Sequence, residues 1–230
     1  FPVTFVYDLI FSLFGVFYFP FFLRRLAQVQ NRKALIRQRL GFLEPGLRSR
    51  CLGKKTLWIH AVSVGEVYAA TSFVEKLRAA LPDFELVLST VTPTGQAAAK
   101  KSFPDLPVFY FPFDWSGAVS RALDAVRPHL VVLMETEIWP NFLAAARKRR
   151  IPVILANGRL SPRSHARYRW ARPWIEEVLE AVDFVLAQTD TDALRFRSLG
   201  IRSDRIAGTG NMKFDVARAG SPEDAARARR

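Results

Sequence analysis

The sequence has few of the residues that build metal and redox sites, with one cysteine and three histidines in 230 residues. Cys51 alone cannot form an intramolecular disulfide, which is typical of a reducing compartment. The histidines at 60, 129 and 165 are scattered, and no HExxH or CxxC spacing occurs. GxxxxGK[ST] is absent, and GxGxxG is missing from the first strand-helix turn, which disfavours P-loop and ordinary dinucleotide-binding proteins. We therefore expect neither a metal ion nor a bound cofactor.

The longest apolar run, residues 3–23, contains one charged residue, Asp8. Its length matches the roughly 20 residues that span a bilayer core. A signal peptide is disfavoured because a basic leader and a small-residue cleavage site are missing. Arg24 and Arg25 follow directly, so the positive-inside rule places the rest of the chain in the cytoplasm. The sequence predicts a membrane anchor helix over residues 1–23, with a buried core helix as the alternative.

The net charge of +13 comes from two basic blocks. Residues 24–55 carry ten lysines and arginines against one acid, Glu44, and residues 141–173 carry nine against none. Basic residues beside a membrane attract anionic headgroups by about 1 kcal/mol each, and the second block suggests an anionic ligand. No usual nucleic-acid-binding module is present, so we expect no nucleic acid partner. A merely solvated basic face is the alternative for either block.

After residue 55, short runs rich in Val, Ile and Leu alternate with helical patterns. Strands are expected at 56–62, 85–90, 107–111, 130–134, 153–156, 184–187 and 205–207. Helices are expected near 67–81, 95–101, 116–126, 141–149, 172–181 and 190–199. Such alternation predicts an α/β fold in which parallel βαβ units form a Rossmann-like, doubly wound sheet.

Polar residues gather directly after these strands, where a parallel sheet has its carboxyl edge and binds ligands. The segments are 63–66, 89–95, 113–114, 135–137, 157–159, 188–189 and 208–211. Glu66 ends the run LWIHAVSVGE at an expected helix N-terminus. There it is either a general base, if its surroundings raise its pKa from about 4.3, or a simple complement to the helix dipole.

The other strand-end residues also have structural alternatives. Glu135 and Glu137 follow the apolar run LVVLM, and ion pairs with the basic block would satisfy them without catalysis. His60 alternates with apolar residues on its strand, which favours a hydrogen-bonded core histidine.

Six motifs in the same order then point to one family. They are WIHAVSVGE at 58–66, STVTPTG at 89–95, YFPFD at 110–114, METEIWPN at 134–141, ANGRLSPRS at 156–164 and GNMKFD at 210–215. Together they closely resemble the N-terminal half of bacterial 3-deoxy-D-manno-octulosonic acid (Kdo) transferases. The resemblance implies the N-terminal domain of an inverting, metal-independent GT-B glycosyltransferase. Such enzymes transfer Kdo from CMP-Kdo to the lipid A precursor, lipid IVA, at the cytoplasmic face of the inner membrane.

The resemblance also implies residue roles. Glu66 matches the general base that deprotonates the acceptor hydroxyl, and Glu135 and Lys213 match positions that stabilise the transition state. Glu137 is the neighbour that could hold the role given to Glu135. Residues implied to contact substrate are Ser63, Gly65, Thr92, Glu137, Asn157, Arg159 and Asn211.

The predicted organisation has four parts. Residues 1–23 form the membrane anchor, 24–55 a basic juxtamembrane segment near anionic lipids, 56–215 the Rossmann-like acceptor-side domain, and 216–230 the start of a linker to a C-terminal donor-binding domain. Without that second domain, we expect the fragment alone to transfer little or no Kdo. Two alternatives stay open: a membrane-bound GT-B transferase with another nucleotide sugar, and a non-catalytic, membrane-bound anion-binding module.

Overall fold

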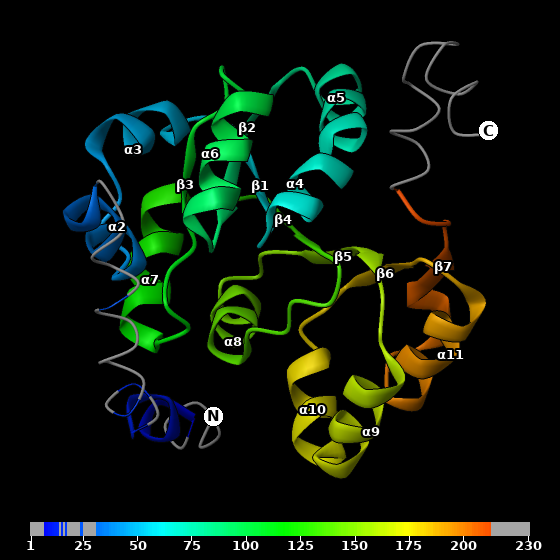
Figure 1. Ribbon diagram of the computed structural model, residues 1–230. Helices are drawn as coiled ribbons and strands as arrows, with labels where there is room; N and C mark the ends of the chain where they lie inside the picture. The colour runs from blue at the N-terminus through cyan, green and yellow to red at the C-terminus, as the bar shows by residue number, and fades with distance from the viewer. Residues whose placement is uncertain (1–6, 14, 16, 18–23, 25–30, 213–230) are drawn as a thin grey trace.

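The computed structural model describes residues 7–13, 15, 17, 24 and 31–212, and its centre is a parallel sheet of seven strands. The strands are β1 Lys55–His60, β2 Phe84–Thr90, β3 Val108–Tyr110, β4 Leu130–Met134, β5 Val153–Gly158, β6 Phe184–Ala187 and β7 Ile206–Gly208. Their order is β3-β2-β1-β4-β5-β6-β7 (Figure 1). This confirms the expected strands and the doubly wound parallel arrangement, in which the chain starts near the middle and winds outward in both directions.

Alternate residues of each strand enter two separate cores, because a buried parallel sheet has helices on both faces. Leu57 and Ile59 pack in one core, and Trp58 packs in the other. Helices α4 Val64–Ala69, α5 Thr71–Ala80 and α6 Pro93–Ser102 cover the first face. Helices α7 Ser116–Val126, α8 Pro140–Lys148, α10 Arg172–Leu179 and α11 Asp190–Ser198 cover the second (Figure 1).

Two helical regions that follow β1 differ from the sequence prediction. The single helix expected over 67–81 is divided at Ala70 into α4 and α5. The Thr71 hydroxyl contacts the Val67 carbonyl at 3.4 Å, a back-bond of the kind that bends helices. Helix α9, Pro162–Trp170, was not expected, although Ser161 caps it by accepting a hydrogen bond from the Ser164 N–H at 3.1 Å, with Pro162 in its first turn.

Part of the basic segment 24–55 packs against the sheet domain. Helices α2 Arg32–Arg39 and α3 Pro45–Cys51 lie within it. The Gln38 side chain accepts a hydrogen bond from the backbone N–H of Tyr110 at 2.9 Å, and Arg39 donates to the Phe111 carbonyl at 2.8 Å. Domain packing thus begins before residue 56, because the strand β3 and its exit loop take hydrogen-bond partners from α2.

Most of the expected anchor, residues 1–23, lies outside the described residues. Within the part of the chain that is described, no helix is both long enough and apolar enough to cross a membrane. Asp8 contacts the folded domain: its carboxylate accepts hydrogen bonds from the Ser116 N–H at 3.2 Å and from the Asn141 side chain at 2.6 Å. Tyr7 stacks on Trp174 with ring centroids 6.0 Å apart. The membrane anchor stays a prediction.

An aromatic cluster at the centre of the second core supports the sheet. Trp58 lies 5.2 Å from Phe142 and 5.8 Å from Phe111, measured between ring centroids. Trp58 also donates its indole N–H to the Ser89 hydroxyl at 2.7 Å, which satisfies the polar atom of this buried side chain.

Replacing Phe142 with alanine should lower the free energy of unfolding by about 3–5 kcal/mol, because the fully buried ring leaves a cavity among Trp58 and Phe111. Urea denaturation measures this loss. The matched control is Leu194→Ala on α11, whose side chain is 59% exposed and should change stability by no more than about 0.5 kcal/mol. Equal effects of the two substitutions would contradict the packing described.

Candidate functional site

The candidate site lies at the carboxyl edge of the sheet, where the loops after β1 and β4 lie side by side. These strands pair directly, with His60 opposite Leu133 near their ends. The loop after β1 leads into Glu66, and the loop after β4 contains Glu135 and Glu137. The topology therefore brings together the three carboxylates that the sequence places far apart.

Glu66 lies in the first turn of α4, and its side chain is 7% exposed. One carboxylate oxygen accepts a hydrogen bond from the Val62 N–H at 2.8 Å, and the other accepts one from the Ser63 hydroxyl at 3.0 Å. Burial raises the pKa of Glu66, the two hydrogen bonds oppose this rise, and the charge of Glu135 adds to it. Glu66 thus binds the two residues that precede its own helix. It also holds a proton more tightly than an ordinary glutamate.

Glu137 shares this environment. Burial, followed by the charges of Glu66 and Glu135, raises the pKa of Glu137 to about 8. Carboxylates that share a poorly solvated site disfavour one another's ionised form. At pH 7 Glu137 therefore holds a proton.

Glu135 has a left-handed backbone conformation, with φ of 57°, which is uncommon for residues other than glycine. Its N–H donates to the Ala156 carbonyl at 2.8 Å, so the bond to β5 helps hold this conformation. Strained backbone of this kind is concentrated at functional sites. Both Glu135 and Glu137 belong to the cluster, and the catalytic role assigned to Glu135 stays a prediction.

Thr92 connects the loop after β2 to the loop after β1. Its hydroxyl caps α6 by accepting a hydrogen bond from the Gly95 N–H at 3.0 Å, and it lies 3.5 Å from the Val62 carbonyl. A Cβ at Gly95 would come within 2.9 Å of that hydroxyl and 3.1 Å of the same carbonyl. The glycine therefore allows α6 to approach the loop that precedes α4, while Gly65 in the first turn of α4 is exposed.

Asn157, at the end of β5, forms hydrogen bonds with the loops after β6 and β7. It is buried at the end of β5 in a left-handed conformation, with φ of 56°. Its side-chain oxygen accepts a hydrogen bond from the Met212 N–H at 3.1 Å, and its carbonyl accepts one from the Gln188 side chain at 3.0 Å. Its side-chain NH₂ has no hydrogen-bond partner among the described residues. Such a buried donor is available to a ligand.

For the remaining predicted site residues, the structure shows fewer side-chain contacts, and one of them lies outside the described residues. Arg159 is exposed, and its carbonyl accepts a hydrogen bond from the Thr136 hydroxyl, which links the loops after β4 and β5. Asn211 is half-buried beside Met212. Lys213 lies outside the described residues, so its predicted role is not addressed by the structure.

Two further titratable residues at this edge are structural. Asp114 is fully buried and accepts hydrogen bonds from the N–H groups of Asn141 and Phe142 at the start of α8; burial raises its pKa to about 7. Its strand-end position was visible in the sequence, but its capping partners were not. His60 is hydrogen-bonded to Ser89 and stacked on Phe111, and burial lowers its pKa to about 3. This confirms a neutral core histidine.

Metal binding finds no support in the cluster. Among the residues that the structure describes, no group of three or more His, Cys, Asp and Glu side chains is arranged to hold a metal ion.

Comparison with known proteins shows the family of this chain. The model of the family described as 3-deoxy-D-manno-octulosonic-acid transferase (kdotransferase) matches residues 34–216. The chain belongs to this family. It is 35% identical over 167 residues to a 3-deoxy-D-manno-octulosonic acid transferase of Haemophilus influenzae, covering 72% of this chain and 39% of that protein. A transferase of the same name from Bordetella pertussis is 38% identical over 168 residues, covering 70% and 38%.

The chain thus spans about two fifths of the length of these curated relatives. Among solved structures, a UDP-GlcNAc 2-epimerase from Neisseria meningitidis has a similar fold, with a TM-score of 0.53 and 16% identity over 72% of this chain and 49% of that chain. The S. aureus MnaA–UDP structure has a TM-score of 0.56 and 16% identity, covering 74% and 47%. At this identity the likeness concerns the fold alone.

The raised pKa of Glu137 makes stability depend on pH in a defined direction. Between about pH 4.5 and 8, Glu137 is protonated in the folded chain and ionised in the unfolded chain. The folded state then binds more protons, so stability is highest below this window and falls as pH rises through it. Glu137→Gln should remove part of this fall, on the order of a few kcal/mol, while the raised pKa values of Asp114 and Glu66 contribute to the remainder.

Urea denaturation of the parent and the Glu137→Gln variant at pH 5 and pH 8.5 measures the difference. The control is Glu75→Gln on α5, an exposed glutamate. If the parent and Glu137→Gln lose equal stability between the two pH values, Glu137 does not have the raised pKa described.

Proposed function

We propose that this chain is the acceptor-side domain of an inverting GT-B glycosyltransferase that moves Kdo from CMP-Kdo to a hydroxyl of the lipid A precursor. The observation that carries the proposal is the buried Glu66, whose raised pKa arises in a carboxylate cluster at the ligand edge of the sheet. Membership of the Kdo transferase family supports the identity of the transferred sugar. A second domain facing this edge is part of the proposal, since the chain spans about two fifths of the length of its curated relatives.

In this reaction Glu66 accepts the proton of the acceptor hydroxyl. The hydroxyl oxygen forms a bond to the anomeric carbon of Kdo, while the bond from that carbon to the CMP phosphate oxygen breaks and CMP leaves with the electron pair. A carboxylate whose pKa is closer to the working pH than that of an ordinary glutamate is still largely ionised, and it is a stronger base towards the hydroxyl proton. The Val62 N–H and the Ser63 hydroxyl hold its two oxygens in place.

Glu135 and Lys213 are proposed to stabilise the charges of the transition state. Glu135 carries negative charge beside Glu66, which suits positive, oxocarbenium-like character at the anomeric carbon. A lysine at 213 follows Met212, whose N–H is held by Asn157, and would offset the charge of the departing phosphate. The NH₂ of Asn157, which lacks a partner within the described part of the chain, and the exposed side chain of Arg159 are proposed to bind polar or anionic groups of the substrates.

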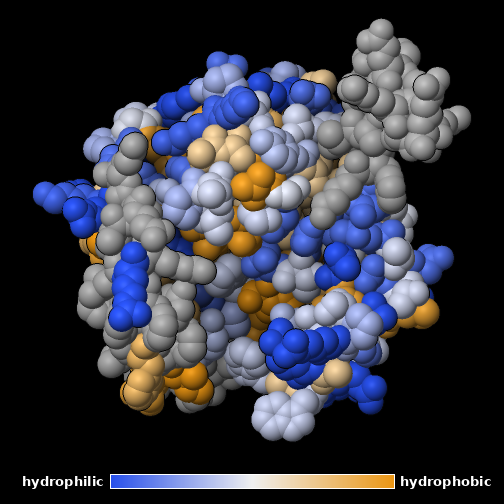
Figure 2. All heavy atoms as spheres, in the orientation of Figure 1, coloured by the Kyte–Doolittle hydropathy of each residue, from blue (hydrophilic) through white to orange (hydrophobic). Residues whose placement is uncertain are grey.

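Helix α9 supports an anionic membrane partner. It has no buried residue, and its exposed side chains include Arg163, Arg167 and Arg169 without an acid among them. Trp170, at its end, is 90% exposed. Figure 2 shows strongly hydrophilic side chains over the region of α9 and α10. Arginine together with exposed tryptophan is typical of contact with lipid headgroups, so α9 is proposed to face the cytoplasmic leaflet of the inner membrane.

Glu66→Gln in the full-length enzyme should lower kcat for Kdo transfer by about 10²–10⁴-fold, because the amide cannot take the proton. Binding of CMP-Kdo should not change. The measurement is Kdo transfer to lipid IVA, with Glu75→Gln on α5 as the matched control at an exposed site. CMP-Kdo and UDP-sugars are compared as donors in the same assay.

Normal transfer by Glu66→Gln would refute its role as base and favour the non-catalytic anion-binding module. Transfer from UDP-sugars but not from CMP-Kdo would refute the proposed donor and favour another nucleotide-sugar transferase.

The triple variant Arg163→Gln, Arg167→Gln and Arg169→Gln should bind vesicles containing anionic lipid on the order of 10²-fold more weakly, since each arginine contributes about 1 kcal/mol. Flotation with phosphatidylglycerol vesicles measures this. A variant with the same loss of charge elsewhere, Arg78→Gln, Lys100→Gln and Lys101→Gln, serves as the control. Equal weakening in both variants would show that net charge alone, and not α9, determines membrane binding.

A further inference from the structure

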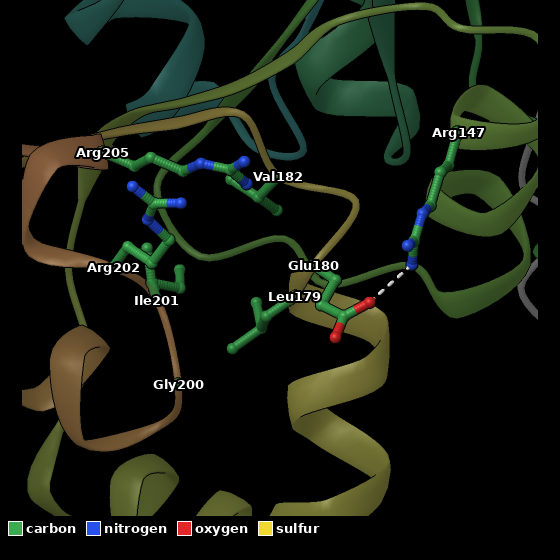
Figure 3. Close-up of a pocket in the computed structure, with 8 residues that line it drawn as sticks. All are labelled: Arg147, Leu179, Glu180, Val182, Gly200, Ile201, Arg202 and Arg205. Atoms are coloured by element: carbon green, nitrogen blue, oxygen red, sulfur yellow. Dashed lines mark hydrogen bonds and ion pairs between the residues drawn. The ribbon is translucent and has the colours of Figure 1, made fainter.

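A pocket lies at the opposite edge of the sheet from the carboxylate cluster. It has a volume of about 330 Å³ and is lined by Arg147, Leu179, Glu180, Val182, Gly200, Ile201, Arg202 and Arg205 (Figure 3). Leu179 and Val182 precede β6, and Arg202 and Arg205 precede β7, so the pocket is at the amino edge. It is therefore separated by the sheet from the strand ends that carry Glu66.

Three arginines give this pocket its charge. Figure 3 shows Arg202 and Arg205 on one side of the pocket, with the Arg205 side chain extending towards Val182, and Arg147 on the other side. Arg202 donates two hydrogen bonds to the Asp204 carboxylate, at 3.0 Å and 2.6 Å, and Arg147 donates one to Glu180 at 2.8 Å. Both pairs are exposed, so an anion that offers the same bidentate geometry can compete with these carboxylates for the guanidinium groups.

Arg205 differs from the other two. Within the described part of the chain, no carboxylate lies in ion-pair distance of its guanidinium, although it contributes to lowering the pKa of Asp204 after the larger effect of Arg202. The three arginines face two carboxylates, Glu180 and Asp204, which leaves a net positive charge around the cavity.

Three of the residues that line the pocket are apolar. Leu179, Val182 and Ile201 are buried. Gly200 has a φ of 98°, and a Cβ there would come within 2.6 Å of the Glu176 side chain, so the turn that carries Ile201 and Arg202 requires glycine. The volume is at the lower limit for small-ligand pockets, and apolar walls with a few charged groups are typical of them.

We propose that this amino-edge pocket binds a phosphate-bearing anion through Arg202 and Arg205. The planar guanidinium groups suit bidentate contacts to phosphate oxygens, and the apolar lining residues accept a short carbon chain next to that phosphate. The phosphate comes either from a soluble phosphate ester or from a lipid headgroup, and both present the same oxygens to the arginines.

The test measures binding and does not depend on Kdo transfer. Inorganic phosphate and pyrophosphate are titrated into the full-length protein by calorimetry, and flotation compares phosphatidic acid with phosphatidylcholine vesicles. We expect saturable binding of at least one phosphate probe. The double variant Arg202→Gln and Arg205→Gln should weaken it at least tenfold.

The control variant Lys100→Gln and Lys101→Gln removes the same charge from α6 and should bind like the parent. Arg202 is 70% exposed as a side chain, so the double variant should keep the parent thermal stability, which is measured in parallel. Loss limited to phosphatidic acid vesicles identifies a lipid headgroup, whereas loss with the soluble probes identifies a free phosphate. Absence of saturable binding, or equal binding by the double variant and the parent, would overturn the proposal.

Discussion

The direct parallel pairing of β1 with β4 is the constraint on which the candidate site depends. It brings Glu66, after one strand, within electrostatic reach of Glu135 and Glu137, which lie about 70 positions later in the chain. An antiparallel or interrupted sheet would separate these groups. Because they share a poorly solvated edge, the charge of Glu135 adds to the raised pKa of Glu66, and the charges of Glu66 and Glu135 add to that of Glu137.

Holding three carboxylates together opposes folding, and the surrounding backbone stabilises the arrangement. The Val62 N–H and the Ser63 hydroxyl bind Glu66, and the bond from the Glu135 N–H to Ala156 fixes a left-handed residue. Asn157 then connects β5 to the loops after β6 and β7. Helix α9 adjoins this edge, since the charge of Glu137 contributes to the raised pKa of Tyr168 on α9. The arginine pocket is at the opposite, amino edge.

Much of this architecture could be predicted because β-branched runs and strand-end polar residues are local signals. The seven strands and the convergence of Glu66 with Glu135 and Glu137 follow from them. The division at Ala70 could not, because it depends on one back-bond of Thr71. The N-cap and proline of α9 were visible, but its basic composition suggested only a charged block. The packing of α2 and the high pKa of Glu137 arise from tertiary contacts and burial, which no local pattern reports.

The central claim, that the cluster turns Glu66 into a base, is tested most directly by titrating its side-chain carboxyl carbon by ¹³C nuclear magnetic resonance. We expect Glu66 to titrate above the ordinary glutamate value of about 4.3. Its pKa should fall when Glu135→Gln removes the neighbouring charge. A Glu66 that titrates at the ordinary value and does not respond to Glu135→Gln would contradict the claim.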